Sequence, residues 1–207
     1  MKKLCVIGLF LLISAGVNAQ KIGIKVGANF ADAKIEEDGI VLDTKSKIGI
    51  VIGIAADFKI VGGLGINTGV DFGQKGTKWS EEFMGAEIEF ATKLNYIIIP
   101  ARLAYTFETG SLGIFIEAGP YFGIGLDGKS EITMDGETEV EDVKFGSDDE
   151  ADLTNPDIGL SAGLGIYAGP IRAAINYDPG LVNISNLDSG SIKTGSVIIS
   201  VAFLFIK

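Results

Sequence analysis

The chain has 207 residues, of which 29 are glycine and 47% are hydrophobic, and its formal net charge is -10. A chain this acidic repels phosphate, so the charge excludes nucleic acid as a partner. There is no histidine, and the single cysteine is Cys5, near the N-terminus. The body of the chain therefore has no disulfide framework and no Ser–His or Cys–His catalysis, and no enzyme is predicted.

Residues 1–19 have the pattern of a secretory signal peptide. A basic start precedes the apolar stretch Leu4–Ile13, and small residues at Val17 and Ala19 supply a cleavage signal. We expect cleavage before Gln20, which leaves residues 20–207 as one exported domain.

The first predicted strand covers residues 22–32, IGIKVGANFAD. Its even positions up to Phe30 are apolar, and its odd positions hold glycine, lysine, asparagine and alanine. Alternation with a period of two is typical of a strand whose two faces meet different surroundings. Seven further segments alternate in the same way: 46–57, 64–73, 94–107, 112–126, 158–168, 171–177 and 196–205. Segment 94–107 is the least regular, and we expect a bulge or a pleat defect at Pro100.

The connections between these segments alternate in length. Three are short, FKIVGG, ETGS and GP, and four are long and polar, at about 33–46, 74–91, 127–156 and 178–194. A membrane barrel has this order, with tight turns at one end and long loops at the other. A strand of about 11 residues, tilted by roughly 40–45°, rises about 26 Å, which matches the apolar band of such a barrel. The predicted fold is all-β, an eight-stranded antiparallel up-and-down transmembrane β-barrel.

The orientation of the strand faces separates a membrane barrel from a soluble one. In a membrane barrel the large aliphatic residues face lipid, and glycine lines a bore that has room for few bulky side chains. In a soluble, lipocalin-like carrier the same aliphatic residues would face inward around an apolar ligand. Glycine is a poor residue for an exposed strand face. The membrane barrel is therefore favoured, and the soluble carrier is kept as an alternative.

Several strings resemble one known family. They are GIKVGANFA directly after the signal peptide, LNYIIIPARLAY, EAGPYFGIGL, DIGLSAGLGI and YDPGLVNIS. They are similar to the small outer-membrane β-barrel proteins of the Bacteroidota, the PorT-like or "porin family" group, over essentially the whole mature chain. The resemblance implies location in the outer membrane, with membrane lipid and the outer-membrane assembly machinery as partners. It implies no particular activity, because most members have no assigned biochemistry.

Charged residues recur on the face that is predicted to line the bore. They are Lys25, Asp71, Arg102, Glu117, Asp157 and Arg172. Because buried ions need partners, we expect a network of salt bridges that fills the bore and holds the strand register. The alternative is a narrow pore for small solutes or ions, although a bore of eight strands is normally filled by side chains.

The connection 127–157 is strongly acidic, with twelve aspartates and glutamates against two lysines. Within it, Asp148, Asp149, Glu150 and Asp152 are candidate contact residues for a basic protein or peptide, and a solvated surface loop is the simpler interpretation. The spacing does not match an EF-hand, so a bound cation is the least favoured alternative. No metal site and no cofactor are predicted.

Together these patterns predict an outer-membrane β-barrel protein with a structural or surface-interaction role. It is expected to be a monomer that contacts an unknown protein partner through its outward loops, without enzymatic activity. Narrow-pore transport and a soluble carrier of an apolar ligand are the alternative functions.

Overall fold

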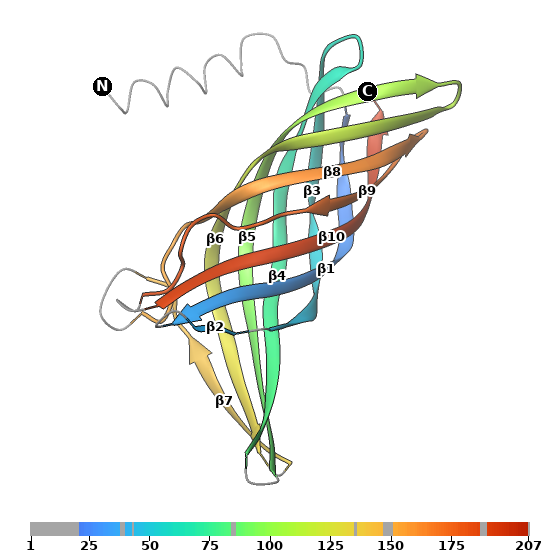
Figure 1. Cartoon of the computed structure of the whole chain (residues 1–207). Coiled ribbons are helices and arrows are strands. Elements are labelled where there is room, and N and C mark those ends of the chain that lie inside the picture. Colours follow the sequence, from blue (N-terminus) through green and yellow to red (C-terminus); the bar gives the residue numbers. More distant parts are fainter. Residues whose placement is uncertain are drawn as a thin grey trace, which may run out of the picture.

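The computed structural model is an antiparallel sheet that closes into a barrel (Figure 1). It describes residues 21–37, 40–42, 44–83, 86–134, 136–146, 151–186 and 190–206. Its strands are β1 (Lys21–Glu37), β2 (Ile40–Leu42), β3 (Lys45–Val61), β4 (Leu64–Phe83), β5 (Ala86–Thr109), β6 (Leu112–Met134), β7 (Glu137–Val143), β8 (Asp157–Ala168), β9 (Ile171–Tyr177) and β10 (Gly190–Ile206). The signal peptide predicted over residues 1–19 lies outside the described residues. In the described part of the chain, no helix has the length and hydropathy that a membrane crossing requires.

Eight of the described strands form the ring, in the order β10-β9-β8-β6-β5-β4-β3-β1. β1 and β10 close it, because they pair antiparallel from Lys21↔Ile206 to Glu37↔Gly190. β2 pairs with β1, and β7 pairs with β6, outside this ring. Closure removes the unpaired strand edges that lipid cannot hydrogen-bond. The predicted eight-stranded antiparallel up-and-down barrel is confirmed.

The two faces of the ring have opposite chemistry. On β1 the outward side chains of Ile22, Ile24 and Val26 are 49%, 60% and 54% exposed, whereas the inward Lys25 and Asn29 are buried. The same alternation follows β3, β6, β8 and β10. An apolar surface that surrounds a whole ring needs an apolar environment, because soluble proteins avoid exposed apolar patches of this size. The predicted outward orientation is confirmed, and the soluble carrier, which requires the reverse orientation, is wrong.

Three tight turns lie at the end of the ring where β1 begins and β10 ends (Figure 1). They join β3 to β4, β5 to β6 and β8 to β9, and each contains a glycine with positive φ: Gly62 (58°), Gly110 (62°) and Gly169 (59°). Other residues are strained at such angles, so glycine suits hairpin turns of this length. These turns are the three short connections that the sequence predicts.

Three of the long connections at the opposite end differ from the sequence prediction. Much of 33–46, 74–91 and 127–156, assigned above to loops, is strand. β4 pairs with β5 as far as Phe83↔Ala86, and β5 pairs with β6 as far as Ile88↔Met134. β7 adds one more strand to β6 in this region.

The resulting four-stranded extension is called the arm below. It comprises residues 74–83, 86–95, 127–134 and 137–143. Figure 1 shows it projecting beyond the ring, away from the end where β10 finishes. Outside the ring no lipid selects apolar residues on the outer face, so this face of the arm becomes polar. In residues 74–83 the strict alternation that predicts a strand is also lost, while the backbone ladder continues.

No bulge lies at Pro100, although the ladder between β4 and β5 is interrupted there, between Thr68↔Ala101 and Asp71↔Ile98. Pro100 pairs in register with Tyr121, and its carbonyl accepts a hydrogen bond from Thr68 Oγ1 at 2.6 Å. The irregularity between β5 and β6 lies instead at Asn95 and Tyr96. It inserts one extra residue on β6, at the level where the ring ends and the arm begins.

Candidate functional site: the polar interior of the barrel

The inward face of the ring carries buried charged side chains. All six residues predicted to line the bore lie inside it, each at most 5% exposed: Lys25, Asp71, Arg102, Glu117, Asp157 and Arg172. Three more charged residues are buried with them, namely Asp57, Lys75 and Asp178. The interior of the described chain therefore holds four cations and five anions. This near balance matters, because an unpaired ion is costly to bury.

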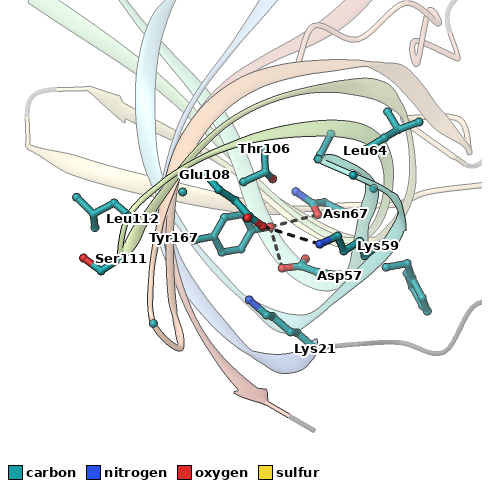
Figure 2. A pocket seen from close by; sticks show the side chains of 18 residues that line it. Lys21, Asp57, Lys59, Leu64, Asn67, Thr106, Glu108, Ser111, Leu112 and Tyr167 are labelled. Carbon is teal, nitrogen blue, oxygen red and sulfur yellow. Dashed lines mark hydrogen bonds and ion pairs between the residues drawn. The ribbon is translucent and has the colours of Figure 1, made fainter.

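The layer nearest the tight turns joins β3, β4, β8 and β9. The guanidinium group of Arg172 forms an ion pair with Asp57. The hydroxyl of Tyr167 donates to Asp57 Oδ2 at 3.0 Å and lies 3.4 Å from Asn67 Oδ1. Figure 2 shows Tyr167 pointing toward Asp57 and Asn67 at this mouth of the barrel. A cavity of about 390 Å³ opens here, and these three residues form part of its wall.

The middle layer is centred on Arg102. Its Nη1 lies 3.8 Å from Glu117 Oε1, and its Nη2 lies 3.4 Å from Asp178 Oδ2. The hydroxyl of Ser161 accepts a hydrogen bond from Arg102 Nε at 2.6 Å and donates to Asp178 Oδ1 at 2.5 Å. Arg102 is on β5 and Ser161 is on β8, so these contacts reach past the intervening strand β6.

Two further sets of contacts belong to the interior. Glu117 accepts hydrogen bonds from the side-chain amides of Asn67 and Asn176, at 2.7 and 2.6 Å. Lys25 on β1 forms an ion pair with Asp71 on β4, although β3 lies between these strands in the ring. Side chains of strands that are not neighbours therefore meet across the bore.

The layer nearest the long connections is built around Lys75. Its ammonium group donates to Asp157 Oδ2 at 2.8 Å, to Thr194 Oγ1 at 3.0 Å and to Tyr121 OH at 3.3 Å. An ammonium group has three N–H donors, so all of them are used. Tyr121 and Thr194 also donate to Asp157, at 3.1 and 2.8 Å. Side chains from β4, β6, β8 and β10 thus hold one buried ion pair.

A lid covers part of this mouth, formed by the described residues of 144–156 and 178–186. Leu153 and Ile184 are 7% and 0% exposed and belong to one apolar cluster with Leu94, Tyr96 and Tyr121, among other residues of the ring and arm. A cavity of about 320 Å³ beside the lid reaches down to Lys75.

The structure pairs some of the predicted bore residues with one another and others with residues that were missed. Two ion pairs join predicted residues: Lys25–Asp71 and Arg102–Glu117. Asp157 and Arg172 instead pair with Lys75 and Asp57. In each strand of the ring every second residue faces inward. Asp57, Lys75 and Asp178 fall on this inward pattern, beyond the inward residues that the sequence analysis assigned. The alternation itself could therefore have identified them.

The acidic contact residues predicted in 127–157 are only partly described. Asp148, Asp149 and Glu150 lie outside the described residues. Asp152 is exposed in the lid, and its carboxylate accepts a hydrogen bond from the backbone N–H of Lys144 at 2.9 Å. The described ranges contain no cluster of three or more cysteine, aspartate or glutamate side chains placed to hold a metal ion.

The chain is similar to known proteins. The family model "Outer membrane protein beta-barrel domain" matches residues 18–186, and no curated protein matches the chain. Similar solved structures include Ail, the attachment invasion locus protein of Yersinia pestis, with 17% identity over 91% of this chain and 100% of that one, at a TM-score of 0.42. Neisserial surface protein A has 17% identity over 92% and 99%, at a TM-score of 0.41. The outer membrane protein OprG from Pseudomonas aeruginosa has 11% identity over 93% and 99%, at a TM-score of 0.45. Because the family model spans most of the sequence, the chain belongs to the outer membrane protein β-barrel domain family.

Proposed function

We propose that this protein is an outer-membrane anchor whose bore is closed by its own ion-paired interior and whose arm and lid contact other molecules outside the cell. The observation that carries this proposal is the series of buried ion pairs, from Arg172–Asp57 at one end to Lys75–Asp157 at the other. Three of the pairs, Lys25–Asp71, Lys75–Asp157 and Arg172–Asp57, join strands that are not neighbours in the ring, so their side chains lie across the bore. A bore of eight strands has little further room.

Several finer assignments belong to the same proposal. Export follows cleavage before Gln20, insertion uses the outer-membrane assembly machinery, and the aliphatic outer face contacts lipid. The closed β1–β10 seam supports a monomer, because the ring has no free strand to pair with a second chain. The family strings quoted above support the PorT-like subgroup. A non-enzymatic role without a nucleic-acid partner is supported by the absence of histidine and the charge of -10.

Conductance in planar bilayers separates a closed barrel from a narrow pore. Folded protein, identified by its heat-modifiable gel mobility, is expected to give no steady current. The double variant Arg102→Ala/Tyr121→Ala removes two large inward side chains and should conduct. The control Leu103→Ala/Phe122→Ala removes outward side chains that are 55% and 41% exposed, and it should stay silent. A steady ohmic current from the unaltered protein would overturn the closed barrel and support the pore.

Cysteine labelling on intact cells tests whether the arm is outside. The mature chain contains no cysteine of its own, so each substitution introduces a single reactive site. Met134→Cys on the arm should react with a membrane-impermeant maleimide, whereas Ser111→Cys in the β5–β6 turn should react only after the cells are opened. The reverse pattern would contradict the proposed orientation.

A further inference from the structure

The arm reverses the chemistry of the ring. In the ring the outward side is apolar and the inward side is polar. On the arm the outward side carries mostly charged residues: Lys78, Glu89, Lys93, Lys129 and Glu131. The other side, called the arm face, continues the inward side of the ring, because Phe90 and Ile88 alternate in step with the buried Leu94 on β5.

The arm face carries an apolar stripe. Its members are Trp79, Ile88, Phe90, Ile132 and Met134. The rings of Trp79 and Phe90 stack at a centroid distance of 4.5 Å, and Met134 is 47% exposed. The apolar cluster under the lid includes Leu94 and Val143 at the base of the arm but no member of the stripe. The described part of the chain therefore covers the stripe only in part: Trp79, Ile88, Phe90 and Ile132 are partly exposed, and Met134 is exposed.

An acidic ridge lies beside this stripe on β7. Glu137, Glu139 and Glu141 pair in register with Met134, Ile132 and Ser130, which places them on the arm face. All three are exposed, and none forms an ion pair with a described cation. Residues two apart in a strand are about 6.8 Å apart, so the ridge presents a regular row of carboxylates.

The arm face leads into the cavity of about 320 Å³ beside the lid. Thr77, Thr92, Ser130 and Glu141 line this cavity from the arm. Three further acids line it: Asp32, Asp142 and Asp152. Lys75 also lines it, but its ammonium group already donates to three oxygens of the layer below. The cavity and the ridge therefore favour a positively charged group.

We propose that the arm face binds a cationic amphipathic segment of a partner protein, with apolar side chains on the stripe and lysine or arginine on the ridge and in the cavity. This inference deepens the proposed function and rests on it. Lysines four residues apart on a helix are about 6 Å apart along its axis, close to the carboxylate spacing. A second copy of the arm fits poorly, because it would bring glutamates against glutamates.

Trp79 is the single tryptophan of the chain, so its emission reports directly on the stripe. The full mature protein is placed in zwitterionic lipid nanodiscs and titrated with a synthetic amphipathic helix of leucine and lysine. Its leucine–glutamate counterpart is the charge control, and empty nanodiscs correct for binding to lipid. The leucine–lysine peptide is expected to shift the emission to the blue and saturate, and the leucine–glutamate peptide is expected to leave it unchanged.

Matched variants test the contribution of the acidic ridge. Glu137→Gln/Glu139→Gln should weaken binding about fivefold, as expected for the loss of two exposed ion pairs. Glu89→Gln/Glu131→Gln removes the same charge from the opposite side of the arm and should change binding less than about twofold. Equal weakening by both variants, equal binding of both peptides, or no binding of either would overturn the inference.

The labelling of Met134→Cys distinguishes a wrong partner for the arm face from a wrong proposed function. If the cysteine is labelled on intact cells but the leucine–lysine peptide does not bind, the arm is displayed outside and only its partner is assigned wrongly. If the cysteine is not labelled, the displayed arm itself is overturned.

Discussion

The substitution Lys75→Met tests whether the ion pair at the loop end stabilises the closed barrel. Methionine keeps most of the side-chain volume but removes the cation that lies 2.8 Å from Asp157. The two side chains are only 3% and 1% exposed, so water does not replace the lost partner. Removing one partner of a buried ion pair costs about 3–5 kcal/mol.

The surrounding hydrogen bonds place the expected loss at the lower end of that range. Asp157 keeps two donors after the substitution, Tyr121 OH at 3.1 Å and Thr194 Oγ1 at 2.8 Å. We therefore expect Lys75→Met to lower the free energy of unfolding by about 3 kcal/mol. The double variant Lys75→Met/Asp157→Asn, which removes both charges, should lower it by only about 1–2 kcal/mol.

Urea unfolding in phospholipid vesicles, followed by Trp79 emission and heat-modifiable gel mobility, measures these differences. Lys78→Met, at an exposed position on the same strand, is the control and should change the stability by less than about 0.5 kcal/mol. A stabilising role of the Lys75–Asp157 ion pair is refuted if Lys75→Met is as stable as this control. It is also refuted if the loss of stability in the double variant equals the sum of the losses in Lys75→Met and Asp157→Asn.

Two further comparisons test the packing of the ring and its lipid contact. Gly165→Ala places a methyl group against the backbone carbonyl of Ala173 and against the ring of Phe115, whose Cζ lies 2.5 Å from the Cβ position. It should cost about 2 kcal/mol in the same unfolding assay. Gly190→Ala, where the nearest described atom is 3.6 Å away, should cost less than about 0.5 kcal/mol, and similar losses would contradict the close packing. Leu164→Lys, on the outward face of β8, should cost about 2–4 kcal/mol in vesicles. Val140→Lys, at a similarly exposed site on the arm, should have little effect, and equal costs would argue against lipid around the ring.

The sequence alone determined the ring and the chemistry of its two faces. Successive side chains of a strand point to opposite sides, so Ile24 and Lys25 face different surroundings whatever strands lie next to them. The eight alternating segments and the alternation of short and long connections then predicted the closed barrel and its tight-turn end. The same alternation along each strand predicted the charged residues on the inward face, without knowledge of which strands or ion pairs form.

Only the tertiary structure decided which inward charges meet and where the arm lies. Closing eight strands sets their stagger, and a shift of two residues would keep every side chain on its face but change its partner. Asp157 meets Lys75, 82 positions away, for this reason. Beyond the ring, lipid no longer demands an apolar outer face, so residues 74–83 lose strict alternation although pairing still satisfies their backbone.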